Sequence, residues 1–126
     1  MGTITDFLGD VTVFTYTRAE AIADGVLVEA DPEIVQAAGF SIPVAMTSTV
    51  YETFVTARSH ESESENLARL GWLLHTVRDA IKSSAEGNRV DFHHMDSDGK
   101  MHELYALLHP GDNGEPVITV MFIGED

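Results

Sequence analysis

The segment SENLARLGWLLHTVRDAIKSS, residues 64–84, decides the fold, because it is the longest periodic stretch in the chain. Its apolar residues recur at intervals of three and four, which places them on one face of an α-helix. This stripe consists of Leu67, Leu70, Leu74, Val77 and Ile81, widened by Leu73 and Ala80. Ser64 is a candidate N-cap and Gly87 a candidate stop. We therefore expect one long central helix with a face wide enough to pack on a sheet.

Trp72 lies away from that stripe. Helical geometry places it roughly opposite Leu70, among polar side chains. The simpler interpretation is that a second helix covers this side and that Trp72 belongs to the core. The alternative is an exposed aromatic anchor for a partner, because tryptophan is enriched at interface hot spots.

Short helices are expected before the central one, and each has an N-terminal capping signal. Thr17 and Glu20 have the spacing of a capping box. Asp31, followed by a proline, and Thr47 are two further candidate caps. The expected helices cover residues 18–24, 32–39 and 48–57, with extended pieces at 26–29 and 43–46 and a strand at 11–16.

After Gly87 the hydrophobic period changes to that of strands. Residues 89–95, 101–108 and 116–123 predict an antiparallel meander, with a two-residue turn at Asp98-Gly99. The last segment is apolar on both faces, which is typical of a covered central strand. The sequence predicts a single α+β domain over residues 1–126. In it, short N-terminal helices and one long central helix pack on a C-terminal three- to four-stranded antiparallel sheet.

Charge is the most unusual property of the chain. Seven basic residues stand against 21 acidic ones, for a net charge of −14. Only residues 67–89 carry more basic than acidic side chains. Direct binding of nucleic acid is not expected, because phosphate recognition needs clustered Lys and Arg. An acidic surface would instead attract basic surfaces of other proteins. Solubility alone also accounts for an acidic composition.

Other features of composition limit the class of protein. The segment SHESESE, residues 59–65, is expected to form an acidic mobile loop. The absence of cysteine excludes disulfides and thiolate metal sites. No segment is long and apolar enough for a membrane span, and the N-terminus lacks the pattern of a signal peptide. We therefore expect a cytoplasmic protein with no membrane partner.

The histidines are the only concentration of candidate metal ligands. With a two-residue turn at Asp98-Gly99, Met95 pairs with His102, and His93 then lies diagonally from His102 on the same face. A diagonal pair can share an ion such as zinc, but no third ligand is identifiable. Exposed or hydrogen-bonded histidines are the simpler interpretation, so no metal or other cofactor is expected.

Five segments carry a family resemblance: YTRAEAIADGVLVE (16–29), AAGFSIPVAMT (37–47), ARLGWLLHTVRDAI (68–81), RVDF (89–92) and PGDNGEPVITVMFIGED (110–126). They resemble an uncharacterised family of small bacterial proteins of plasmids, phages and other mobile elements. The resemblance covers nearly the whole chain and implies an accessory protein of a mobile element in a bacterial cell. It implies no activity and no catalytic residues.

This context and the acidic charge together predict a non-enzymatic, protein-binding inhibitor of a host defence system that targets nucleic acid. Anti-CRISPR and anti-restriction proteins are of this type, and some could mimic nucleic acid. The expected partner-binding residues are Glu61, Glu63, Glu65, Asp96, Asp98, Glu103 and Trp72. One alternative is an enzyme or metalloprotein that uses His93 and His102. Another is a self-associating structural module, such as a homodimer.

Overall fold

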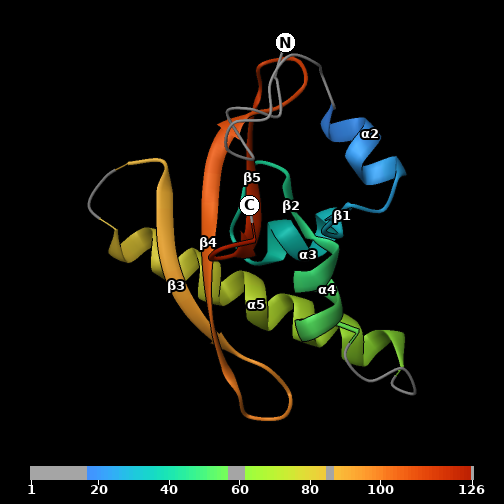
Figure 1. Cartoon of the computed structure of the whole chain (residues 1–126), viewed down its shortest axis with the longest axis vertical. Coiled ribbons are helices and arrows are strands. Elements are labelled where there is room, and N and C mark those ends of the chain that lie inside the picture. The colour runs from blue at the N-terminus through green and yellow to red at the C-terminus, as the bar shows by residue number, and fades with distance from the viewer. Residues whose placement is uncertain (1–16, 57–61, 85–86, 126) are drawn as a thin grey trace.

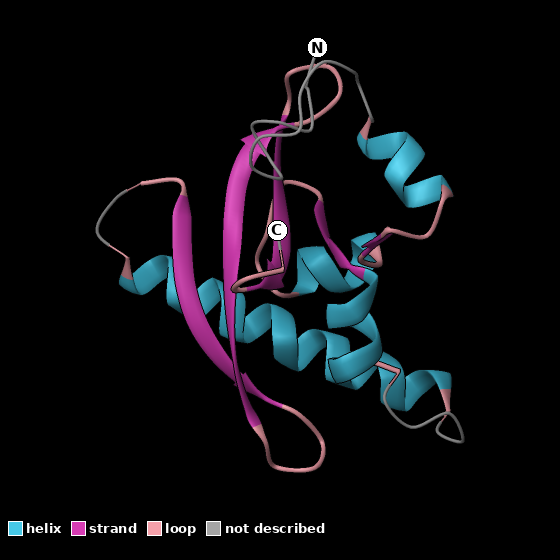
Figure 2. Ribbon diagram, in the orientation of Figure 1, coloured by secondary structure: helices cyan, strands magenta, loops and turns pink. Residues whose placement is uncertain are grey.

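The computed structural model describes residues 17–56, 62–84 and 87–125, and the strand expected at residues 11–16 lies outside them. Its helices are α2 (Arg18–Ala23), α3 (Pro32–Ala37), α4 (Ser48–Phe54) and α5 (Glu63–Ser83). Its strands are β1 (Leu27–Glu29), β2 (Val44–Thr47), β3 (Arg89–Met95), β4 (Met101–Pro110) and β5 (Pro116–Phe122). Figures 1 and 2 show α5 crossing behind a single twisted sheet. The expected α+β class is confirmed.

The sheet is mixed and has five strands, so the prediction of a three- to four-stranded antiparallel sheet is wrong. Its strand order is β1-β2-β5-β4-β3, with β2 and β5 parallel and the other pairs antiparallel. The two additional strands, β1 and β2, come from segments that the sequence indicates only as extended. With 3 and 4 residues, they are too short for an alternating pattern to identify them.

Helices α2, α3 and α4 begin where the capping signals predict. Thr17 and Glu20 form a reciprocal capping box at the start of α2. The side chains of Asp31 and Thr47 accept backbone hydrogen bonds at the starts of α3 and α4. These caps satisfy amide groups that would otherwise lack partners, and they therefore fix where each short helix starts.

The long helix α5 begins earlier than the sequence suggests. Ser62 rather than Ser64 is its N-cap, and Glu65 completes a second capping box. The expected acidic loop at residues 59–65 is therefore helical from Glu63 onward. Residues 59–61 of that loop lie outside the described part of the chain.

The core lies between the sheet and helices α3, α4 and α5. From α5 it takes Leu70, Leu73, Leu74 and Val77, whereas Ile81 is 38% exposed. Each fully buried leucine contributes about 1.5–3 kcal/mol to stability. The other elements contribute Val35, Val44, Met46, Val50, Phe54, Phe92, Leu104, Ala106, Ile118 and Val120.

Strand β5 occupies the central position that its doubly apolar sequence predicts. It lies between β2 and β4, and residues 117–121 are all buried. On the sheet face opposite α5, the Tyr105 hydroxyl donates a hydrogen bond of 2.7 Å to the sulfur of Met121. Within the described residues, no helix combines the length and the apolar character needed to cross a bilayer.

Candidate interaction surface

The β3–β4 hairpin determines where the candidate histidines lie. Its strands pair Met95 with Met101, His94 with His102 and His93 with Glu103. The predicted register is wrong by one residue, because residues 96–100 form a longer loop in place of a two-residue turn. His93 and His102 therefore lie on opposite faces of the hairpin. The pair that the sequence suggested for a shared metal does not form.

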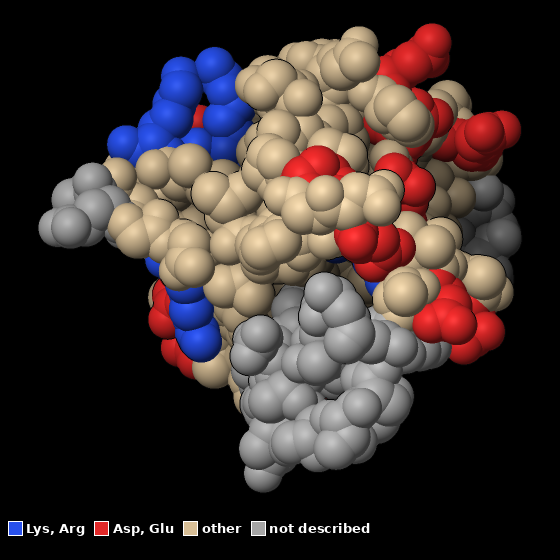
Figure 3. All heavy atoms as spheres, turned by 90° about the horizontal axis from the view of Figure 1, so that it is seen from above, with Lys and Arg blue, Asp and Glu red and all other residues tan. Residues whose placement is uncertain are grey.

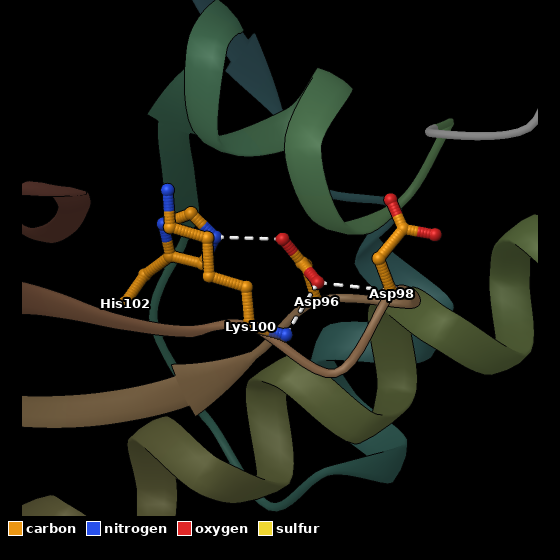
Figure 4. A network of polar contacts seen from close by, with 4 residues as sticks. All are labelled: Asp96, Asp98, Lys100 and His102. Atoms are coloured by element: carbon orange, nitrogen blue, oxygen red, sulfur yellow. Dashed lines mark hydrogen bonds and ion pairs between the residues drawn. The ribbon is translucent and has the colours of Figure 1, made fainter.

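Asp96 organises this loop (Figure 4). One carboxylate oxygen, Oδ1, accepts hydrogen bonds of 2.9 Å from the backbone amides of Asp98 and Lys100. The other, Oδ2, lies 2.8 Å from Nε2 of His102. The bond with His102, followed by that with the Lys100 amide, lowers the pKa of the Asp96 carboxyl. An aspartate that bonds amides further along its own turn is the sequence signal that distinguishes this loop from a two-residue turn.

The carboxylate of Asp96 is already hydrogen-bonded to the loop and to His102, so little of it remains to bind a partner. Its side chain is only 14% exposed. The ring of His102 lies near Phe54 and Phe122, with centroid distances of 5.4 and 5.5 Å. The aromatic surroundings of the Asp96–His102 pair and its loop contacts indicate that it holds the hairpin in shape.

His94 is a buried polar residue at the end of the core. It is 3% exposed, and its Nε2 has no hydrogen-bond partner in the described structure. Its ring packs against Trp72 and Phe54, with centroid distances of 4.4 and 5.0 Å. Burial, followed by the charge of His102, lowers the pKa of His94 to about 4. His94 is therefore neutral at pH 7.

Trp72 is 53% exposed, so of its two interpretations the one that places it in the core is wrong, and the side chain is exposed as the alternative requires. The element beside it is strand β3 rather than a second helix, and His94 of that strand packs against the indole ring. Contact on one side and exposure on the other are typical of an aromatic residue that is positioned for a partner.

The hairpin beside Trp72 exposes a mixed apolar and acidic surface. Met95 and Met101, which pair across the strands, are 39% and 53% exposed. The side chain of Glu103 is 67% exposed and lies 3.4 Å from Nε2 of His93. We define the hairpin surface as Trp72, Met95, Asp98, Met101 and Glu103. This surface extends around the hairpin, because Trp72 lies on the face of His94, and Met95, Met101 and Glu103 point to the opposite face.

The other candidate acids lie on a different element. Glu63 and Glu65 are in the first turn of α5. Glu65 also accepts a hydrogen bond of 2.9 Å from the Ser62 amide, so the helix cap uses its carboxylate. The start of α5 and the hairpin loop both lie in the lower part of the view in Figure 1. Glu61 lies outside the described residues.

A second polar network, which no sequence motif indicates, joins α2 to the β4–β5 turn. The fully buried Thr119 hydroxyl accepts a 2.7 Å hydrogen bond from Nη1 of Arg18. It lies 2.7 Å from Nε2 of His109, whose Nδ1 lies 3.0 Å from the Pro110 carbonyl. Because a carbonyl can only accept, Nδ1 donates and Nε2 accepts the Thr119 proton. Burial lowers the pKa of His109, which favours this neutral form.

The same network fixes the start of α2. Oδ1 of Asp112, in the β4–β5 turn, accepts a 2.7 Å hydrogen bond from the backbone amide of Arg18. Across residues 17–56, 62–84 and 87–125, no group of three or more His, Asp or Glu side chains is arranged to hold a metal ion. The network therefore docks α2 onto the sheet, and the hairpin surface remains the candidate functional site.

The fold and this surface define a small α+β protein with helices packed on a mixed sheet and an acidic hairpin beside an exposed tryptophan of α5. The chain belongs to DUF6573, a family of unknown function whose profile matches residues 5–126. No curated protein and no solved structure matches the chain.

Proposed function

We propose that this protein binds another protein, and that the hairpin surface contacts a basic surface of that partner. The observation that carries this proposal is the 53% exposure of Trp72 beside the acidic hairpin. Tryptophan is enriched among the residues that dominate binding energy at interfaces. Neighbouring carboxylates such as Glu103 complement Lys and Arg on the partner.

The contact with His94 makes Trp72 a suitable anchor. Their ring centroids lie 4.4 Å apart, so the indole has a packing partner before any binding occurs. A side chain that is already positioned loses less conformational entropy when the complex forms. Met95 and Met101 supply adaptable apolar surface on the same hairpin.

The net charge of −14 supports a protein partner over nucleic acid. Phosphate groups would be repelled, whereas a basic groove would be attracted over about a Debye length of 8–10 Å. Electrostatic attraction of this kind mainly raises the association rate, and salt weakens it.

The particular partner in this proposal is a host defence protein that targets nucleic acid, of the CRISPR or restriction type. The resemblance to proteins of plasmids and phages supports this context. The acidic surface supports competition with nucleic acid for a basic groove. The protein would then act by occupying that groove, without catalysis, in the bacterial cytoplasm.

Affinity capture from host lysate, at low and at high salt, tests the proposal. The test variant combines Asp98→Asn with Glu103→Gln, which changes the net charge by two. The control combines Glu29→Gln with Glu33→Gln, which makes the same change on β1 and α3, away from the hairpin. We expect the hairpin variant alone to lose about tenfold or more of the low-salt affinity.

Trp72→Ala should reduce capture at both salt concentrations, because its contribution is mainly apolar. Unchanged low-salt capture by the Asp98→Asn/Glu103→Gln variant would contradict the electrostatic proposal. The molecular mass of the purified protein in solution tests the alternative of self-association. A dimer that becomes a monomer in Trp72→Ala would assign the hairpin surface to a homodimer.

A further inference from the structure

We propose that a pocket separate from the hairpin surface binds a small amphipathic anion, an apolar chain or ring that carries one carboxylate. The pocket lies between the C-terminal end of α5 and the part of the sheet where β3 begins, and its volume is about 310 Å³. This volume is at the lower end of the range for small-molecule sites. The proposal is independent of the protein partner proposed above.

The walls of the pocket are mainly apolar. Ile81 and Leu108 line it and remain 38% and 42% exposed, so apolar surface at the pocket is in contact with water. An apolar ligand that covers them removes this surface from water, which is favourable. The remaining apolar lining residues are Phe40, Ile42, Val90, Ala106 and Ile118.

Arg78 places a positive charge beside this apolar lining. It packs so closely on the lining residue Gly39 that a Cβ at position 39 would lie 2.7 Å from Nε of Arg78. Gly39 also has a φ of +100°, so any larger residue would be strained as well as crowded. Glycine at this position therefore gives the guanidinium its place next to the pocket.

Lys82 lies one helical turn after Arg78 and on the same side of α5. Among residues 17–56, 62–84 and 87–125, no carboxylate forms an ion pair with either cation.

The charge distribution on the face of the molecule drawn in Figure 3 agrees with this assignment. Figure 3 shows basic side chains gathered at the left, the side on which α5 ends in Figure 1. Acidic side chains spread over the right of the same view. The basic side chains gathered on this side of the view favour an anion at this end of the molecule. The apolar lining favours a ligand with a single charged group over one with many, because each buried charge must be paired.

The test is a titration of the ¹⁵N-labelled full chain with decanoate, below the concentration at which it forms micelles. Decan-1-ol serves as the uncharged probe of the same length. We expect saturable amide shifts at Ile81, Val90 and Leu108, with about tenfold tighter binding of decanoate than of decan-1-ol. The amides of Met95 and Met101, on the hairpin surface, should not shift.

Matched variants test the positive charge and the apolar lining of the site separately. Arg78→Gln should remove the preference for decanoate over decan-1-ol, whereas Lys100→Gln, an equal charge change on the hairpin, should not. Ile81→Trp should block both probes, whereas Val26→Trp, at another exposed apolar position, should block neither. The absence of saturable shifts at the pocket in the folded chain would overturn the proposal. So would equal affinity for decanoate and decan-1-ol.

Discussion

The indole ring of Trp72 packs against the imidazole of His94, with ring centroids 4.4 Å apart. One member of this pair is 53% exposed and the other 3% exposed. The contact therefore connects the surface proposed for partner binding to the core that supports the hairpin. A change that displaces the indole also admits water to a buried imidazole, so the hairpin surface and the protonation of His94 are coupled.

His94 should make the protein less stable as the pH falls from 7 to 4. Its pKa is about 4 in the folded protein, against 6.5 for an unperturbed histidine. Between these values the unfolded chain binds more protons, so protonation favours unfolding. The difference corresponds to about 3 kcal/mol of stability lost over this range. Urea unfolding measured at several pH values gives this quantity.

His94→Phe is the control variant for this prediction. Phenylalanine keeps a ring against Trp72 and Phe54 but does not titrate. Between pH 7 and pH 4 the variant should therefore lose about 3 kcal/mol less stability than the original protein. An identical pH dependence in both proteins would show that other groups cause the loss.

Trp72→Ala should raise the pKa of His94 from about 4 toward its ordinary value, because burial is the largest cause of its depression. Titration of the His94 ring protons by NMR measures this change. Met101→Ala is a suitable control, because Met101 is also 53% exposed but lies on the other face of the hairpin. A pKa that stays near 4 without the indole would mean that Trp72 does not shield His94.

Thr119→Val should destabilise the protein by about 1–3 kcal/mol, although valine has nearly the same shape as threonine. The substitution leaves Nη1 of Arg18 and Nε2 of His109 without their shared hydroxyl partner. Thr76→Val is the control, because the Thr76 hydroxyl bonds only a carbonyl of its own helix. Denaturant unfolding compares the two, and an equal loss of stability would contradict the role assigned to Thr119.

Leu73→Ala and Ile81→Ala should differ strongly in their effect, although both residues belong to the apolar stripe of α5. Leu73 is completely buried, so its truncation should cost about 2–5 kcal/mol. Ile81 is 38% exposed, so its truncation should lower the stability by less than about 1 kcal/mol. Thermal and urea unfolding measure both. Similar losses would mean that the end of α5 is packed as tightly as its centre.

Sequence patterns identify the local elements of this fold well. The predicted strand at residues 89–95 has the observed bounds of β3, and the caps at Thr17, Asp31 and Thr47 are confirmed. The hairpin register was not predictable from the Asp98-Gly99 pair, because Asp96 competes for the same backbone amides. This one-residue difference changed which histidines face each other, and with them the candidate metal pair.

The sequence specifies helices α2 to α5 and strands β3, β4 and β5, because hydrophobic period and capping act between residues a few positions apart. It also determined that β5 would be central, since both faces of that strand are apolar. Only the tertiary structure decided that β2 pairs with β5, in which Val44 lies opposite Ile118. It also decided that Trp72 is exposed and that Arg78 packs against Gly39, a residue of the apolar pocket. Each of these features depends on contacts between segments that are distant in the chain, and local sequence patterns do not predict such contacts.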